Sequence, residues 1–241
     1  MLKNINRNNI LFLDIETVSA FPDFSGLSEK MKELWAKKME YTIDKEGETA
    51  EELYHRAGIF SEFGKIVCIS VGFFYSRNGK NKFRIKSFYG DDEKALIKGF
   101  NDLLDGAFNS ENHYLCAHNG KEFDFPYIAR RSLINGLKLP VLLDIAGKKP
   151  WEVKHLDTLE LWKFGDYKHY TSLALLTEIF NIPTPKDDID GSEVGRVYWE
   201  EKNLQRIVEY CQKDVLAIAQ LYLRYKGENL IDKEDVEVVD N

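Results

Sequence analysis

Three apolar segments in the first ninety residues limit the folds open to this chain more than any other feature. The segment at 65–75 is rich in β-branched residues, and the segment at 82–89 alternates polar and apolar side chains. Asn78-Gly79 lies between them, and Asn-Gly at such a place is typical of a two-residue hairpin turn. A shorter apolar run, NILFLD at 9–14, indicates a buried strand. These three strands can pair as an antiparallel meander.

Further along the chain, short strands alternate with helical patterns. A helix is predicted at 91–105 from an aspartate cap, and another buried strand, HYLCAH, at 113–118. Helices are expected at about 124–136 and 201–226, with a short strand at 153–156. Strands separated by helices join a sheet in parallel through crossovers. The sequence therefore predicts an α/β fold with a mixed five- to six-stranded sheet flanked by helices.

No linker or internal repeat divides the chain, so residues 1–241 are interpreted as a single domain. Residues 20–62 are polar, with a helical pattern on both sides of Gly47, which indicates a helical insertion lying over the core. Residues 227–241 are interpreted as an acidic tail.

The composition and the cysteines favour an intracellular protein. Apolar residues make up 44% and charged residues 30%, and no apolar run approaches the roughly 18 residues of a membrane span. Cys68, Cys116 and Cys211 each lie in an apolar stretch, and none forms the CxxC pair of a zinc ribbon. Reduced, buried thiols are typical of the cytoplasm, so we expect a cytoplasmic protein that does not bind a membrane.

The net charge of −7 argues against a strongly basic surface for nucleic acid, because such surfaces neutralise phosphates with lysine and arginine. It is compatible with a nuclease that carries a carboxylate cluster, since bound divalent ions supply local positive charge. Basic stretches occur at 77–86, 130–131 and 148–149. Each is either a contact to a polyanion or a solvated face, and the sequence leaves both interpretations open.

The first candidate site is Asp14-Ile15-Glu16, directly after the apolar run. Residues two apart on a strand point to the same side, so both carboxylates are expected to converge at the strand end. Two like charges at the edge of a core are unfavourable unless a cation binds both. The alternative is that the strand has ended and both side chains face water.

The second candidate site follows the strand at 113–118. Asn119-Gly120 marks a sharp turn, and Asp124 then begins a helix, where an aspartate can also serve as an N-cap. The segment is rich in aromatic residues, Phe123 among them, which can stack on nucleic-acid bases. Aromatic residues in such a segment are more often part of the core.

The third candidate site is on the C-terminal helix. Tyr210 and Asp214 are four residues apart and share one helix face. Asp214 lies three residues after Cys211 and four before Ile218, inside the apolar stripe, so its charge needs a partner. The alternative is an ion pair with a basic residue of the same helix, but the nearby basic residues are poorly placed for it.

Together the acids make a more specific pattern than any one motif. The set consists of Asp14, Glu16, Asp124 and Asp214. It suits a phosphodiester hydrolase in which two metal ions about 4 Å apart stabilise the attacking and leaving oxygens. Carboxylate ligands favour Mg²⁺ or Mn²⁺ over zinc.

These segments resemble a known family. DIET at 14–17, HNGKEFDFPYI at 118–128 and YCQKDV at 210–215 are similar to the three exonuclease motifs of the DEDD superfamily. Glu209 stands where the histidine subclass carries histidine, so the chain resembles the tyrosine subclass, DEDDy. It is most similar to the proofreading 3′–5′ exonuclease of family-B DNA polymerases and to stand-alone bacterial forms of that domain. The resemblance implies a ribonuclease H-like fold.

The resemblance also implies roles for the motif residues. Asp14 would bridge two Mg²⁺ or Mn²⁺ ions, and Glu16 and Asp214 would help to hold the ion that activates water. Asp124 would support the second ion. Tyr210 would orient the attacking water or help to deprotonate it.

Three further features rest on the resemblance alone. Asn119 and Phe123 match motif positions near the substrate terminus. Asp157 recurs in similar sequences, and a helix cap before Thr158 explains it equally well. DDIDGSEV at 187–194 is similar to the family's segment before the last helix.

Two features depart from the proofreading domain. The chain carries no polymerase region, so proofreading within one chain is not expected, and residues 20–62 are longer than the family pattern suggests. That segment could cover the site or dock a polymerase or repair partner. The leading hypothesis is removal of nucleotides from the 3′ end of single-stranded DNA. The alternatives are an exoribonuclease, and a catalytically silent module that binds nucleic acid or a repair protein.

Overall fold

A computed structural model describes residues 2–166, 170–183 and 189–239. Its centre is a six-stranded sheet with the order β5-β4-β1-β2-β3-β6. The strands are β1 Ile10–Ser19, β2 Gly64–Arg77, β3 Lys80–Tyr89, β4 Tyr114–Ala117, β5 Leu156–Asp157 and β6 Val236–Val239. β1, β2 and β3 pair antiparallel, whereas β4, β5 and β6 each join in parallel. The predicted mixed α/β sheet is confirmed, and it is consistent with a ribonuclease H-like fold.

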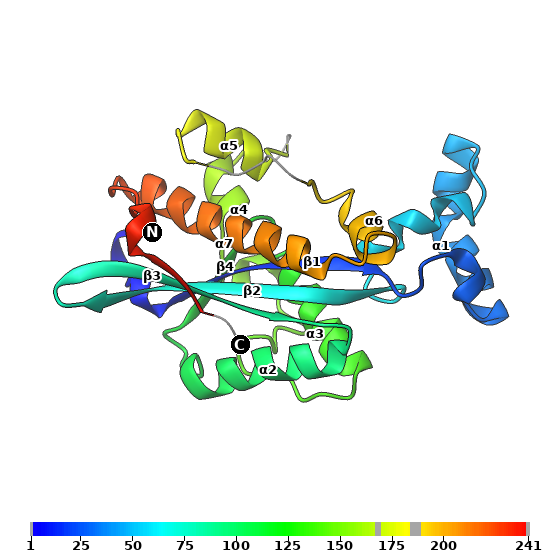
Figure 1. Cartoon of the computed structure of the whole chain (residues 1–241), viewed down its shortest axis with the longest axis horizontal. Coiled ribbons are helices and arrows are strands. Elements are labelled where there is room, and N and C mark those ends of the chain that lie inside the picture. Colours follow the sequence, from blue (N-terminus) through cyan, green and yellow to red (C-terminus); the bar gives the residue numbers. More distant parts are fainter. Residues whose placement is uncertain (1, 167–169, 184–188, 240–241) are drawn as a thin grey trace.

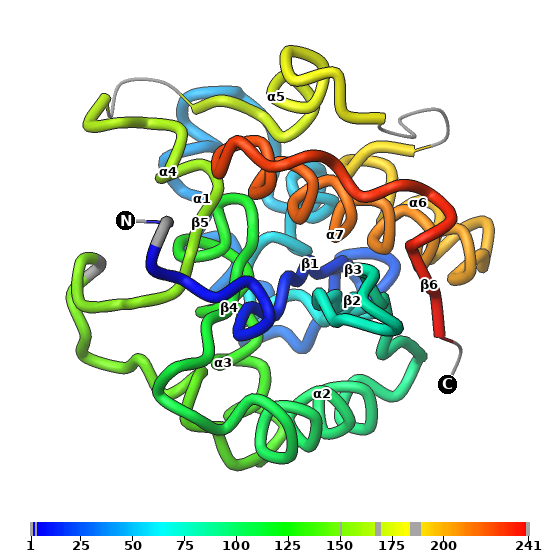
Figure 2. Tube along the Cα trace, turned by 90° about the vertical axis from the view of Figure 1, so that its left-hand side faces the viewer, coloured from blue at the N-terminus to red at the C-terminus, as the bar shows by residue number. Residues whose placement is uncertain are grey.

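Helices cover both faces of this sheet. They are α1 Glu29–Glu46, α2 Glu93–Ala107, α3 Asp124–Ile134, α4 Thr158–Lys163, α5 Leu173–Ile179, α6 Val194–Trp199 and α7 Leu204–Lys226. The long helix α7 lies on one face, with α5 above it, while α2 and α3 lie on the other (Figures 1 and 2). None of the helices in the described ranges is both long and apolar enough to cross a membrane.

The local sequence explains the hairpin between β2 and β3. Asn78 has a φ of 54° and Gly79 a φ of 74°, and a type I′ turn needs positive φ at both positions. Asp92 caps α2 by accepting a hydrogen bond from the Ala95 N–H at 3.0 Å, as the sequence predicts.

The expectation that the first strand ends at the acids is wrong. β1 continues to Ser19 because β2 supplies a pairing partner as far as Gly64, with a bulge between Glu16 and Thr17. Asp14 and Glu16 therefore lie within the strand. At Asp14 the side chains change from apolar to acidic, but the backbone pairing with β2 continues.

The interpretation of 227–241 as an acidic tail also needs correction. Its residues 236–239 form β6, which pairs with β3 at the edge of the sheet (Figure 2). Glu237 accepts hydrogen bonds from Tyr75 and Arg84, and Asp235 lies 3.5 Å from the Lys82 ammonium. The acids of the tail thus neutralise part of the basic stretch at 77–86. Residues 240–241 lie outside the described part.

Residues 20–62 contain α1 and a 3-10 helix, η4 (Glu52–Ile59), and α1 ends at Gly47 with a φ of 74°. A small apolar cluster around the fully buried Trp35 joins the two helices. Its indole N–H donates to the Ala50 carbonyl at 2.7 Å. Figure 1 shows α1 beyond the end of the sheet, so this helix does not lie over the core, whereas η4 packs against β1.

Smaller differences concern element ends. β5 covers only 156–157 rather than 153–156, because β4 offers it two pairing partners. α7 begins at Leu204 rather than 201, since Asn203 caps it. The segment at 187–194 contains the start of α6, and its residues 187–188 lie outside the described part.

Candidate active site

The alternation of β1 aims its acids at α7. Leu11, Leu13 and Ile15 pack into the core on the side of α2 and α3. Ile10 and Phe12 pack against α7, so Asp14 and Glu16, which continue this series, point to the same face. Glu16 is only 7% exposed, which rules out the alternative that both acids face water.

The face of α7 that carries Cys211 and Asp214 packs against these acids, as the sequence predicts. Cys211 is fully buried, and its thiol donates to the Asp14 carbonyl at 3.3 Å. Ligand atoms of Asp14, Glu16 and Cys211 all lie within 4.8 Å of one another. Asp214, one helical turn further along, contributes its charge to the same cluster, where it raises the pKa of both other acids.

The turn after β4 brings the fourth acid. Asn119 adopts a φ of 64°, and Gly120 packs so closely that a Cβ there would lie 2.4 Å from the Ala117 Cβ. The chain then enters α3 at Asp124, which is 4% exposed and follows the cap residue Phe123. The structure thus brings Asp124 close to the carboxylates of β1 and α7. The charge of Asp124 raises the pKa of Asp14 and of Glu16, and the charge of Asp214 raises the pKa of Asp124.

The electrostatics of this cluster are unfavourable. Burial, followed by the charge of Glu16, raises the pKa of Asp14 well above its usual range. Burial, followed by the charge of Asp214, does the same for Glu16. Burial is also the main reason that the pKa of Asp124 rises to about 7. The folded protein therefore holds carboxylates close together at a cost that a bound cation would remove.

The residues fit a divalent metal ion. The Oδ2 atom of Asp14 is buried and has no hydrogen-bond partner among the described residues. Such an oxygen is costly unless it binds a ligand. Burial raises the pKa of the Cys211 thiol, so carboxylates rather than a thiolate are the available ligands. Hard cations such as Mg²⁺ and Mn²⁺ prefer oxygen ligands of this kind.

Tyr210 is half-buried beside these acids. Burial, and then the charges of Asp214 and Glu16, raise the pKa of its hydroxyl. Asn119 and Phe123 both lie at the turn before Asp124 and are half-buried. The other aromatic side chains of this segment belong to the core, since Phe125 and Tyr127 are almost fully buried.

Asp157 is a residue whose role the sequence revealed only in part. It caps α4 by accepting from the Leu159 N–H at 2.9 Å, as one interpretation predicted. Its two oxygens also accept from the backbone N–H groups of Asn119 and Lys121. Asp157 therefore fixes the turn that carries Asp124, and no local pattern indicates this because the bonded segments are far apart in sequence.

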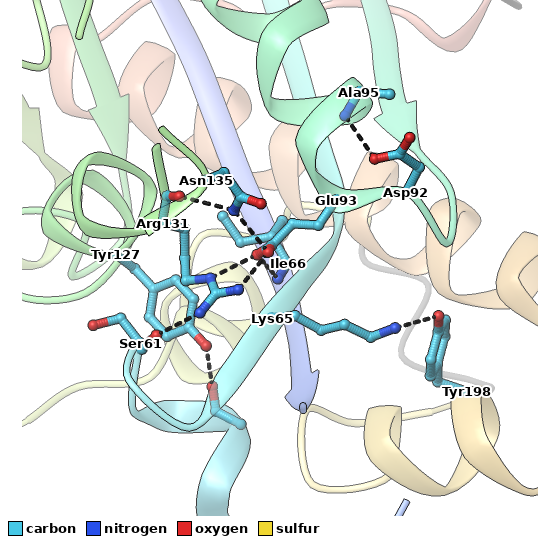
Figure 3. Close-up of polar contacts among 11 residues, drawn as sticks. Ser61, Lys65, Ile66, Asp92, Glu93, Ala95, Tyr127, Arg131, Asn135 and Tyr198 are labelled. Atoms are coloured by element: carbon cyan, nitrogen blue, oxygen red, sulfur yellow. Dashed lines mark hydrogen bonds and ion pairs between the residues drawn. The ribbon is translucent and has the colours of Figure 1, made fainter. Parts of the chain in front are cut away.

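A second support, which holds the far end of the helix that begins at Asp124, was not predicted (Figure 3). Glu93 accepts hydrogen bonds from the Ile66 N–H, the Arg131 guanidinium and the Asn135 amide. Arg131 also donates to the Ser61 carbonyl at 2.9 Å. This buried network joins α2, α3 and β2. It also shows that Arg131, part of a basic stretch, is an internal ion-pair partner and not a solvated face.

A family described as a predicted 3′–5′ exonuclease related to the exonuclease domain of PolB matches residues 59–237. The chain belongs to this family. The matched range contains Asp124, Tyr210 and Asp214, and it begins after Asp14 and Glu16. The predicted resemblance to the family-B exonuclease domain is confirmed.

Archaeal DNA polymerases are similar to the same part of the molecule. The polymerase of Desulfurococcus sp. (strain Tok) is 25% identical over 190 residues, which are 71% of this chain and 23% of that protein. The polymerase of Pyrococcus glycovorans is 23% identical over the same shares of the two chains. This exonuclease-like chain thus spans about a quarter of the length of these relatives.

Proposed function

We propose that this protein is a divalent-metal-dependent 3′–5′ exonuclease of the DEDDy type that degrades single-stranded DNA. The observation that carries the proposal is the cluster of Asp14, Glu16, Asp124 and Asp214, in which Glu16 and Asp124 are buried and an Asp14 oxygen lacks a partner among the described residues. A cluster of this kind is unfavourable in the folded protein without bound cations.

The four carboxylates would hold two Mg²⁺ or Mn²⁺ ions, which supply positive charge to the attacking and leaving oxygens of a phosphodiester. Asp14 and Glu16, fixed on a strand, would set the position of the cluster, while Asp157 fixes the turn before Asp124 and the Glu93 network anchors α3. The Tyr210 hydroxyl would orient the attacking water. Asn119 and Phe123, at the turn before Asp124, would contact the terminal nucleotide.

DNA is the proposed substrate because the similar proteins are DNA polymerases. Three buried free cysteines, reduced in the cytoplasm, support a cytoplasmic location for this activity. A polymerase or repair protein that supplies the 3′ end would be the natural partner.

The test uses single-stranded DNA and matched RNA, each labelled either at the 5′ or at the 3′ end, with Mg²⁺ or Mn²⁺. The proposal predicts a ladder of shortening products from the 5′-labelled DNA and immediate release of the 3′ label. Degradation of RNA alone would keep the chemistry and replace the substrate. Binding without degradation of either strand would favour the silent module.

A further inference from the structure

A pocket outside the acid cluster lies where α6 joins α7. Its cavity of about 380 Å³ opens beside the first residues of β2. The lining side chains are Lys65, Asp91, Tyr198, Trp199, Lys202 and Leu204. The pocket therefore combines two cations with two aromatic rings in a protein whose net charge is −7.

The two lysines converge on one aromatic ring. The Lys65 ammonium lies 4.8 Å from the centre of the Trp199 ring, and the Lys202 ammonium lies 5.0 Å from it. Each contact is a favourable cation–π interaction. The two ammonium groups nevertheless repel each other. Burial is the main reason that the pKa of Lys65 falls; the charges of Asp91 and Glu93 oppose this fall, and the charge of Lys202 adds to it. An anion between them would relieve this repulsion.

The one acid among the lining residues, Asp91, already accepts a hydrogen bond. The Tyr198 hydroxyl donates to Asp91 at 2.6 Å and accepts from the Lys65 ammonium at 2.8 Å, a contact visible in Figure 3. Among the described residues, Tyr198 is the one hydrogen-bond partner of the Lys65 ammonium. Two of the three ammonium N–H groups are thus left for a ligand or water.

Lys202 is held in an uncommon backbone conformation. Its φ is 53°, in the left-handed region that residues other than glycine and asparagine seldom adopt. The Asn203 N–H donates to the Val197 carbonyl at 3.2 Å, which fixes the tight junction around it. The junction therefore places an exposed lysine at the pocket at some conformational cost.

The pocket has a defined position relative to the acids. The Trp199 indole N–H donates to the Ser19 carbonyl at 3.2 Å. Ser19 lies three residues after Glu16 on β1, a separation of roughly 10 Å at about 3.3 Å per residue. That distance corresponds to about three stacked nucleotides of a strand. Tyr198 also packs in the same apolar cluster as Cys211 of α7, so the pocket and the acids share one face.

We propose that Lys65 and Lys202 bind a backbone phosphate of a single strand, about three nucleotides from the 3′ end that lies at the acid cluster. This inference rests on the proposed exonuclease function. It adds the substrate's path: from the carboxylates the strand passes over the junction of α6 and α7.

The test measures binding of a labelled hexanucleotide and a dinucleotide by fluorescence anisotropy at several salt concentrations, with chelator present so that nothing is degraded. Lys202→Gln should weaken hexanucleotide binding about threefold to tenfold and reduce its salt slope by about 0.7. Dinucleotide binding should not change. Lys233→Gln, an exposed lysine beside β6 and roughly 30 Å along β2 from Lys65, is the matched control.

The binding readout does not depend on catalysis, so loss of the exonuclease proposal would leave this test intact. An unchanged affinity and salt slope in Lys202→Gln would overturn the strand-phosphate site. A second result would also overturn it: inorganic phosphate raises the melting temperature of the wild type but not of Lys202→Gln, while both proteins bind the hexanucleotide equally well. That result would indicate a site for free anions.

Discussion

Replacing Asp124 with asparagine is expected to stabilise the metal-free protein near pH 8, although it removes a proposed metal ligand. The side chain is 4% exposed, and burial, with Asp157 and Asp214 nearby, raises its pKa from 3.8 to about 7. Between these values the folded protein keeps a proton that the unfolded chain has lost. Stability therefore decreases as the pH rises through this window, and the loss is complete above about pH 7.

The size of the effect follows from the shift. About three pKa units at roughly 1.4 kcal/mol each correspond to about 4 kcal/mol. The unfavourable repulsion is distributed over all the acids of the cluster, Asp14, Glu16 and Asp214 included. The expected gain in the free energy of unfolding for Asp124→Asn is therefore about 1 to 4 kcal/mol near pH 8. Below about pH 4 the gain should vanish. Each kcal/mol raises the melting temperature of a domain of this size by about 2 to 4 °C.

Thermal unfolding in chelator, at both pH values, measures this difference. Glu122→Gln, an exposed acid two residues earlier, is the matched control and should leave the melting temperature unchanged. Mn²⁺ at about a hundredfold its Kd should then stabilise the wild type by about 2.7 kcal/mol and the Asp124 variant by less. A variant that melts below the wild type in chelator near pH 8 would refute the reasoning.

Three further predictions concern the supports of the site. Asp157→Ala removes the acceptor of four backbone N–H groups and should cost about 2 to 4 kcal/mol in urea unfolding; a loss under about 0.5 kcal/mol would mean that water replaces it. Glu93→Gln leaves the buried Arg131 charge without its carboxylate and should cost about 3 kcal/mol in the same assay, and equal stability would contradict the importance of this network. Burial lowers the pKa of His155 to about 4, so up to about 3 kcal/mol of stability should be lost as the pH falls from 6.5 to 4. His155→Gln should remove that component from urea unfolding compared at the two pH values, and an unchanged pH dependence would reject it.

The sequence predicted those parts of the fold and site that depend on local periodicity. Alternation on β1 placed Asp14 and Glu16 on one face, and the helical repeat of α7 placed Asp214 in a buried stripe. The Asn78-Gly79 turn predicted the hairpin because its backbone angles suit few other residues. These patterns depend only on residues a few positions apart, so they can be recognised without knowledge of the tertiary structure.

Contacts between distant segments could not be predicted in this way. β6 lies in an acid-rich segment, and its pairing with β3 depends on ion pairs across more than 150 residues, such as that between Glu237 and Arg84. The turn at Asn119 depends on Asp157, whose local sequence indicates only a helix cap. Arg131 is polar in sequence, but its side chain is only 12% exposed, because it pairs with Glu93. In each case a partner far along the chain decides the environment of the side chain.

The most direct test of the account is the rate at which wild type, Asp14→Asn and Glu209→Gln shorten a 5′-labelled single strand of DNA with Mn²⁺. Glu209 is exposed and next to Tyr210, so it is a matched acid outside the cluster. The account predicts stepwise shortening from the 3′ end by the wild type and Glu209→Gln, and loss of at least about a hundredfold in rate in Asp14→Asn. Equal rates for all three folded proteins would contradict the claim that this carboxylate cluster is the catalytic centre.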